Sequence, residues 1–221
     1  RTVTGVQTCA LPISGVFIRS MATRGHLGGL SLATSEAVRL LDAMGSPCTL
    51  VETVGVGQVE VEIARNADTV VVVVNPGWGD SVQANKAGLL EIADVFVINK
   101  SDRPGVDQTQ RDLEQMLELS DIASGVWRPM IVRTVGTTGE GAENLWQAII
   151  AHRQHASNDG SLAKRREQRL RNELRAIIER RLEHRAREIC TGERWDAIQN
   201  EMLARSRDPW SCADEMLAGV L

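Results

Sequence analysis

The sequence has no long hydrophobic run. Its longest strand-like apolar stretch, Thr69 to Val74, is far shorter than the roughly 20 apolar residues that a membrane-spanning helix needs. We therefore expect no membrane association. The 221 residues are 43% hydrophobic and 24% charged, a composition typical of a soluble globular protein with a substantial core.

Paired cysteines are also missing. The chain has no C-x-x-C pair and no histidine near a cysteine at ligand spacing, so neither a disulfide framework nor a zinc site is indicated. The four cysteines are scattered at Cys9, Cys48, Cys190 and Cys212. This pattern favours a reducing cytoplasm.

Clustered metal ligands and a strong positive charge are absent as well. His152 and His155 stand three residues apart, but no third ligand is evident, so we interpret them as part of a solvated helix face. The net charge of −4 argues against a general nucleic-acid binder.

A phosphate-binding P-loop is the next absence. No G-x-x-x-x-G-K-[ST] string occurs in the sequence. Such a loop wraps phosphates with backbone N–H groups, neutralises them with its lysine and binds Mg²⁺ through its hydroxyl. Residues 1–14 (RTVTGVQTCALPIS) start without methionine, and their apolar part is too short and polar for a secretory signal. We expect them to be a non-native scar and exclude them from the fold argument.

From Gly15 onward, short apolar stretches alternate with longer segments of helical period. Val70 to Val74 is the clearest strand, because a continuous run of β-branched residues favours a strand covered on both faces. The expected strands are 16–19, 49–53, 69–75, 94–99 and 130–134, and the expected helices are 30–44, 80–92, 107–119 and 141–155. This alternation predicts an α/β fold with a mostly parallel sheet over residues 15–156.

Residues 157–221 contain no strand candidate after the turn-forming residues 157–160. One long helix and two shorter ones, 194–205 and 210–217, are predicted. Arginines and glutamates interleave over residues 164–188, which favours a charged outer face over a nucleic-acid-binding stripe. An apolar stripe on the long helix requires a partner, either the first domain or a second copy of the chain. It comprises Leu162, Leu170, Leu174, Ile177, Ile178, Leu182, Ala186 and Ile189.

Asn99-Lys100-Ser101-Asp102 directly follows a predicted strand, at the edge where open α/β sheets bind ligands. The Asp102 carboxylate could accept hydrogen bonds from N1–H and the exocyclic amine of guanine, which adenine does not present in that arrangement. Asn99 would brace the loop and approach O6 and N7, and the stem of Lys100 would lie along the base. The alternative is an ordinary turn, since Ser101 and Asp102 before Pro104 have turn chemistry unaided.

Other loops follow predicted strands. Glu52 comes before two glycines, Gly55 and Gly57. The acid could accept from a Mg²⁺-bound water, and the glycines would let the loop approach a γ-phosphate. A simple turn is equally consistent there. The glycine-rich Met21 to Leu30 opens a helix and suits an approaching anion, and Val135 to Thr137 could supply backbone N–H groups to the same base.

Taken together, three strings resemble the methylmalonyl-CoA mutase-associated GTPases of the MeaB/ArgK type. They are Val16 to Leu30, Val51 to Gln58 and Asn99 to Pro104, with Asp208-Pro-Trp210 near the end. The resemblance covers nearly all of residues 15–221. It implies a P-loop GTPase domain, here with an incomplete sheet, followed by an all-helical dimerisation arm over 157–221.

The resemblance further implies binding of GTP or GDP with Mg²⁺. It implies a homodimeric chaperone that gates cofactor loading of an adenosylcobalamin-dependent methylmalonyl-CoA mutase and protects or reactivates that enzyme. Carried over by position, the roles are base reading by Asn99, Lys100 and Asp102, base-pocket backbone from Val135, Gly136 and Thr137, a Mg²⁺-shell carboxylate at Glu52, and catalytic candidates Gly57 and Gln58.

In that family the P-loop lies upstream of residues 16–19. We therefore expect this chain to be the C-terminal part of a longer protein, and to bind GTP weakly and hydrolyse almost none alone. Two alternatives remain open. One is a metal-insertion accessory GTPase, although those carry Cys/His clusters. The other is a helical dimerisation or adaptor module whose partial nucleotide domain is inert.

Overall fold

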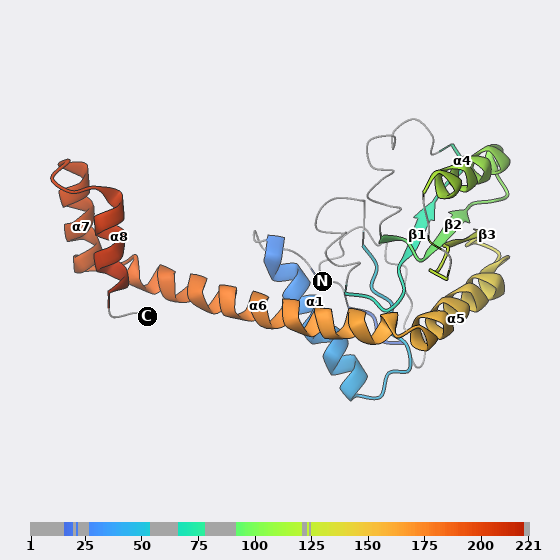
Figure 1. Ribbon diagram of the computed structural model, residues 1–221, viewed down its shortest axis with the longest axis horizontal. Coiled ribbons are helices and arrows are strands. Elements are labelled where there is room, and N and C mark those ends of the chain that lie inside the picture. Colours follow the sequence, from blue (N-terminus) through green and yellow to red (C-terminus); the bar gives the residue numbers. More distant parts are fainter. Residues whose placement is uncertain are drawn as a thin grey trace. The chain divides into compact units, whose positions relative to one another are not determined.

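The computed structural model (Figure 1) describes residues 16–19, 21, 27–53, 66–77, 92–120, 123 and 125–218. The elements are α1 (Leu27–Ala43), β1 (Val71–Val74), β2 (Val95–Asn99), α4 (Val106–Leu119), β3 (Met130–Thr134), α5 (Ala142–Asn158), α6 (Ser161–Ile189), α7 (Glu193–Leu203) and α8 (Pro209–Leu217). The chain divides into two compact units, residues 1–171 and 172–221.

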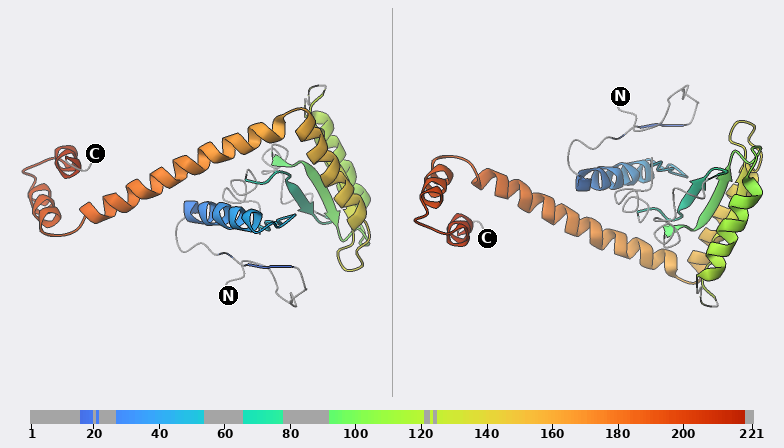
Figure 2. Two further views of the ribbon diagram at one scale, coloured as in Figure 1. Left: turned by 90° about the horizontal axis from the view of Figure 1, so that it is seen from below. Right: turned by 90° about the horizontal axis from the view of Figure 1, so that it is seen from above.

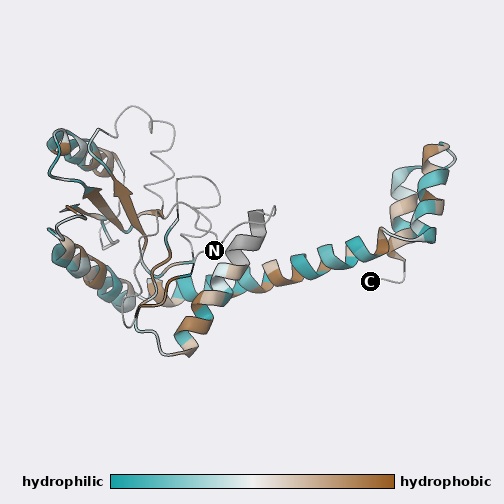
Figure 3. Cartoon of the chain, turned by 180° about the vertical axis from the view of Figure 1, so that it is seen from behind, coloured by the Kyte–Doolittle hydropathy of each residue, from teal (hydrophilic) through white to brown (hydrophobic). Residues whose placement is uncertain are grey.

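The sheet of the first unit is parallel, in the order β1-β2-β3, with Val71 opposite Val95 and Asn99 opposite Thr134. Alternate residues of β2 face opposite sides. Phe96 and Ile98 pack with the apolar face of α4, whereas Val95 and Val97 pack with α5. Because both faces of the central strand β2 are covered, its residues from Val95 to Ile98 are all apolar and buried, as in central parallel strands (Figure 3).

The covering helices begin at glycines with left-handed backbone. Gly105 (φ 93°) precedes α4 and Gly141 (φ 76°) precedes α5. In α4 the buried side chains Leu113, Met116 and Leu117 recur at helical spacing and form one stripe against the sheet. Each turn thus brings its helix back over the sheet directly after a strand (Figure 1).

A short turn at Asp159 and Gly160 separates α5 from α6, so that α6 starts in a new direction (Figure 2). Asp159 Oδ1 accepts from the backbone N–H of Ser161 at 2.8 Å, which caps the start of α6. The two compact units divide within α6, beyond this turn. Four apolar side chains of the predicted stripe, Leu170, Leu174, Ile178 and Leu182, are 49–60% exposed.

The second unit contains a small helical pair. Ile198 of α7 packs with Cys212 and Met216 of α8. Asp208 caps α8 by accepting from the backbone N–H groups of Trp210 (2.9 Å) and Ser211 (3.1 Å). Pro209 occupies the first turn, where its missing N–H costs nothing.

Most of the predicted elements are confirmed, and the fold is α/β with a parallel sheet. Two predicted strands are wrong, because residues 16–19 and 49–53 have no regular structure. Apolar residues form a strand only where a neighbouring backbone pairs with them, and in the described part of the chain the sheet ends at β1 on that side. The predicted helix 80–92 lies outside the described residues except for Ile92. None of the described helices has both the length and the apolarity of a membrane span.

Candidate functional site: the carboxyl edge of the sheet

Asn99 ends β2 and joins two loops at the carboxyl edge of the sheet. Its Oδ1 accepts from the backbone N–H of Gly136 at 3.1 Å and lies 3.4 Å from the hydroxyl of Thr134. The backbone N–H of Ser101 donates to the carbonyl of Thr134 at 3.1 Å. The structure therefore brings together the loop after β2 and the loop after β3, which we predicted to share one base.

The loop from Lys100 to Gly105 is tight and open to solvent. Lys100 has a φ of 57°, a left-handed conformation that a side chain with Cβ adopts at a cost. The carbonyl of Lys100 accepts from the N–H of Arg103 at 3.0 Å, which closes the turn. The side chains of Lys100 and Asp102 are exposed. A strained turn that presents a lysine and a carboxylate is suited to a ligand with a flat face and donor groups.

A third loop reaches the same edge from β1. The N–H of Gly77 donates to the hydroxyl of Thr109, a buried residue of α4, at 3.3 Å. A side chain at Gly105 would lie 3.7 Å from the nitrogen of Gly77. The turn after β1 and the turn before α4 are thus in contact.

The turn from Val135 to Gly141 forms the other wall. Val135 is buried and pairs with Glu140 in an antiparallel bridge. The carbonyl of Val135 accepts from the N–H groups of Thr138 (3.1 Å) and Gly139 (2.9 Å). Gly136 and Thr137 are exposed at the tip. A Cβ at Gly136 would meet Asn99 Oδ1 at 3.4 Å, so a small residue there lets the two loops approach.

The remaining predicted residues do not join this cluster in the described part of the chain. Glu52 lies in an irregular segment, residues 51–53, with its side chain exposed. Gly57 and Gln58, the catalytic candidates, lie outside the described residues, as does Gly55. Among the residues that the structure covers, His, Cys, Asp and Glu side chains form no group of three that could hold a metal ion.

The family model described as "Methylmalonyl Co-A mutase-associated GTPase MeaB" matches residues 8–191. This chain belongs to the MeaB family. The match begins within the 1–14 segment that we excluded from the fold argument, and it includes the carboxyl edge of the sheet.

Relatives of this MeaB-family chain are named as GTPases or after methylmalonic aciduria. A Pyrococcus horikoshii protein, named provisionally as a GTPase, is 47% identical over 94% of this chain and 65% of its own length. The mouse protein named methylmalonic aciduria type A homolog, mitochondrial, is 32% identical over 91% of this chain and 49% of its own length. The Escherichia coli GTPase ArgK is 36% identical over 69% and 47%, respectively. The chain thus spans about half to two thirds of these relatives.

A solved structure, titled as a LAO/AO transport system kinase, has the same fold. It superposes with a TM-score of 0.61 at 25% sequence identity, over 87% of this chain and 63% of its own. Relatives named as GTPases and the family description together identify a guanine-nucleotide-binding GTPase family.

A second polar cluster, which sequence reasoning missed, lies at the opposite end of β2. Asp94, just before β2, is 3% exposed and accepts from the backbone N–H of Val70 at 2.8 Å. Arg165 of α6 binds both of its carboxylate oxygens at 2.8 Å. His152 Nε2 of α5 lies 3.2 Å from its Oδ1, and Trp127 Nε1 donates to its backbone carbonyl at 2.8 Å. Burial alone would raise the pKa of Asp94, but Arg165, His152 and the Val70 N–H lower it to about 2.

His152 is 1% exposed, so the prediction that it lies on a solvated face is wrong. Its Nδ1 lies 2.9 Å from the hydroxyl of Thr69, which can donate to it while Nε2–H donates to Asp94. Hydroxyl, imidazole and carboxylate stand in the order of a hydrolase triad. Because the imidazole is buried and the carboxylate is already paired with Arg165, we interpret the arrangement as structural. The sequence did carry one indication of this burial, because His152 lies four residues from both Ala148 and Ala156, on the face of α5 that packs inward.

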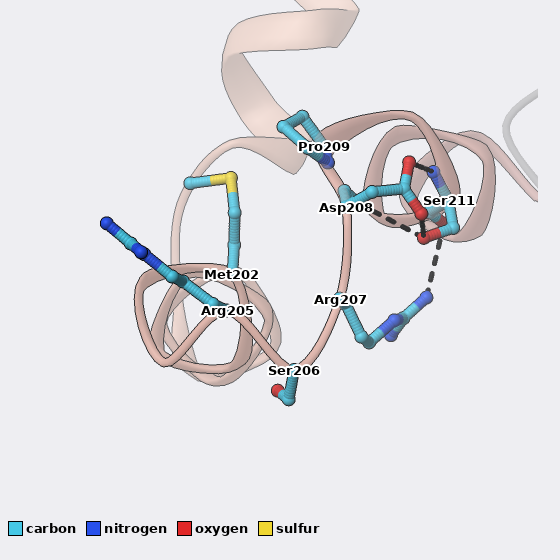
Figure 4. A pocket seen from close by; sticks show the side chains of 7 residues that line it. All are labelled: Met202, Arg205, Ser206, Arg207, Asp208, Pro209 and Ser211. Atoms are coloured by element: carbon cyan, nitrogen blue, oxygen red, sulfur yellow. Dashed lines mark hydrogen bonds between the residues drawn. The ribbon is translucent and has the colours of Figure 1, made fainter.

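The second unit has a surface pocket of about 490 Å³ between α7 and α8 (Figure 4). Most of its polar groups already bond to other groups of the same helical pair. Arg207 pairs with Glu201 (3.2 Å) and Glu215 (2.6 Å), and Asp208 already caps α8. Ser211 donates to Asp208 at 2.6 Å. We therefore assign no ligand to this pocket.

Proposed function

We propose that this chain supplies the base-recognition part of a GTPase that binds GTP and GDP. The observation that carries the proposal is the Asn99 carboxamide, whose Oδ1 is turned toward the Gly136 N–H. This orientation leaves the Nδ2 protons to donate to O6 and N7 of a guanine. A preset donor loses little freedom on binding, which favours affinity.

The neighbouring residues would complete the base pocket. The exposed Asp102 would accept from N1–H and the 2-amino group of guanine. Lys100 would lay its aliphatic stem along one face of the ring. Val135, Gly136 and Thr137 would form the far wall, with Gly136 and Thr137 exposed at the tip. An adenine would leave the Asp102 carboxylate without donors, which costs on the order of 1–3 kcal/mol.

The phosphate side depends on other parts of the chain. Glu52 is an exposed carboxylate and would hold a Mg²⁺-bound water, since Mg²⁺ keeps most of its waters and takes few protein ligands. With nucleotide bound, the ion would supply charge neutralisation for the β- and γ-phosphates. Gly57 and Gln58, the catalytic candidates, would belong to a moving loop next to the γ-phosphate. Because the 221 residues contain no P-loop string, we propose that they hydrolyse almost no GTP alone.

The partner we propose is an adenosylcobalamin-dependent methylmalonyl-CoA mutase. The family description names association with methylmalonyl-CoA mutase, and this supports a chaperone that gates cofactor loading and protects or reactivates the enzyme. We further propose a homodimer in the cytoplasm. The exposed apolar side chains of α6, such as Leu174 and Ile178, support pairing of two copies because isolated exposed stripes favour association.

Competition binding tests the base pocket. We would titrate the chain with a fluorescent guanine nucleotide in Mg²⁺ and displace it with GDP, ADP or xanthosine diphosphate. GDP should compete at least about tenfold better than ADP. Asp102→Ala should abolish this preference. Asp102→Asn should shift it toward xanthosine diphosphate, because a carboxamide can donate to the C2 carbonyl of xanthine.

Asp112→Asn is the matched control, because Asp112 lies on α4 and bonds only to Gln108 of the same helix in the described structure. It should leave the preference unchanged. Equal competition by GDP and ADP would refute the base pocket. It would favour the adaptor alternative if the chain still dimerises, as measured by analytical ultracentrifugation.

A further inference from the structure

The amino end of the sheet carries a buried ionic cluster that the proposed GTPase function does not use. We propose that Asp94 and Asp68 form a charge-dependent latch that docks the first turns of α6 on the sheet, and that these turns undock when the carboxylates are neutralised. The latch comprises Asp68 and Asp94 on the sheet side and Arg165, Arg166 and Arg169 on α6. All five residues belong to the first compact unit.

The stronger contact is between Asp94 and Arg165. Both guanidinium Nη atoms reach the carboxylate at 2.8 Å, a bidentate geometry. The Asp94 side chain is 5% exposed and that of Arg165 is 40% exposed. A buried carboxylate is tolerated only when it is paired, so the sheet requires Arg165 in place.

The Asp94 acceptor is also held by groups outside α6. Val70 donates to Asp94 from the segment before β1, and Trp127 holds its backbone carbonyl from the segment before β3. His152 of α5 is the other titratable side chain that the described structure places against Asp94. Because these groups hold Asp94 rigidly, Arg165 meets a preset site and loses less freedom on docking.

The second contact involves the next residue of α6, Arg166, and Arg169, which lies one turn beyond Arg165. Arg166 and Arg169 both bind Asp68, the latter at 2.9 Å. The side chains of Asp68 and Arg169 are 32% and 20% exposed, so this pair is partly shielded from water, whereas the Arg166 side chain is 52% exposed. Two carboxylates thus engage successive arginines on one side of α6.

The rest of α6 uses its charges differently. Arg171 pairs with Glu167 and Arg175 with Glu179, in both cases along the same helix and with exposed side chains. Such pairs add little stability and attach the helix to nothing else. In the described structure, the arginines of α6 that bond to the sheet side are thus Arg165, Arg166 and Arg169.

Hydrogen exchange of the 221-residue chain tests the latch without any nucleotide. In Asp94→Asn, the carboxamide keeps the shape and can still accept from Val70, but the charge is lost. We expect backbone N–H protection over residues 165–171 to fall by about tenfold or more, while protection in β2 falls less. Glu167→Gln, the matched control on the same turns, should change neither region. Equal protection in Asp94→Asn and the parent would overturn the proposal, as would an absence of protection in the parent.

A comparison of single and double variants distinguishes loss of the Asp94–Arg165 pair from general unfolding. Arg165→Met leaves the Asp94 carboxylate buried and unpaired, and should cause the larger loss of protection. The double variant Asp94→Asn/Arg165→Met removes that charge and should recover part of the protection relative to Arg165→Met alone. Losses that simply add would show that the two side chains do not act as a pair and would overturn the latch. Since no readout involves guanine, failure of the base pocket leaves this result unaffected.

Discussion

The two ends of β2 carry polar sites that are built in opposite ways. At the carboxyl end, Asn99 holds two loops together while Lys100 and Asp102 remain exposed. At the amino end, Asp94 is buried and surrounded by donors from four other parts of the chain. An exposed set of polar groups can bind a ligand, whereas a buried and satisfied set can only hold the protein together.

The two ends of β2 should also differ in how substitutions change the free energy of unfolding. Changes at the exposed loop should alter nucleotide binding and leave stability nearly unchanged, because water replaces the lost contacts there. Changes at the amino end should lower stability, because the abandoned partners stay buried.

Substitution of Gly141 should lower the free energy of unfolding the most, because the backbone around this glycine is closely packed. A Cβ at Gly141 would lie 2.0 Å from the carbonyl oxygen of Arg133, and φ is +76°. We expect Gly141→Ala to lower the free energy of unfolding by about 4 kcal/mol, as measured by urea denaturation. Gly139→Ala is the control, because φ is +79° there but no atom lies within 4 Å. It should cost about 1 kcal/mol. Equal losses would mean that the turn shifts freely.

The next largest effect should be a loss of stability at low pH, caused by protonation of Asp94 at the amino end of β2. Arg165, His152 and the Val70 N–H lower the pKa of Asp94 to about 2 despite its burial. Since the folded pKa lies below the ordinary value of 3.8, the stabilisation is complete above the unfolded pKa and is lost as pH falls toward the folded one. We expect about 2 kcal/mol of unfolding free energy to disappear between roughly pH 4 and pH 2. Asp94→Asn should flatten the dependence of the unfolding free energy on pH in this range, as measured by urea denaturation at each pH.

An unchanged pH dependence in that variant would assign the acid sensitivity to other carboxylates, such as Asp68, whose pKa is lowered by Arg166 and Arg169 despite its burial.

Substitution of Trp127, at the same end of β2, should lower stability by a smaller amount. Its indole N–H donates to the backbone carbonyl of Asp94, and its ring stands edge-on to His152 with 5.2 Å between ring centroids. Trp127→Phe keeps an aromatic ring and loses the donor, so we expect a loss of about 1 kcal/mol in chemical denaturation. Trp210→Phe is the control, because Trp210 is 82% exposed, and it should change stability by less than about 0.5 kcal/mol. Equal effects would contradict a buried role for the indole N–H.

The contrast also explains what the sequence could predict. The strands 71–74, 95–99 and 130–134 and the helices α4 to α8 follow from apolar runs and helical spacing, because these patterns reflect burial on one or both faces. The candidate residues at the carboxyl edge could be proposed from the sequence because they stand in short contiguous stretches that directly follow strands. Residues 16–19 and 49–53 were misjudged, since strand formation depends on a pairing neighbour that apolar composition alone does not reveal.

The amino-end cluster could not be found in this way. Its members are separated by long stretches of chain, for example 71 residues between Asp94 and Arg165. A charged residue before a strand and an arginine in a charged helix each resemble ordinary surface residues. Only the fold shows that Arg165 and Asp94 meet, and that His152 is buried against them.

Thr134 offers the smallest expected effect and the sharpest test of the contrast. Its hydroxyl lies 3.4 Å from Asn99 Oδ1, near the limit for a hydrogen bond, whereas the Gly136 N–H lies at 3.1 Å. If the backbone donor holds Asn99, Thr134→Val should change stability by less than about 0.5 kcal/mol and guanine-nucleotide affinity by less than about twofold. Urea denaturation and nucleotide competition would measure both. A loss of affinity of tenfold or more, recovered in Thr134→Ser, would show that a buried hydroxyl supports Asn99. The carboxyl end would then depend on a buried polar contact much as the amino end does, and the distinction between the two ends would fail.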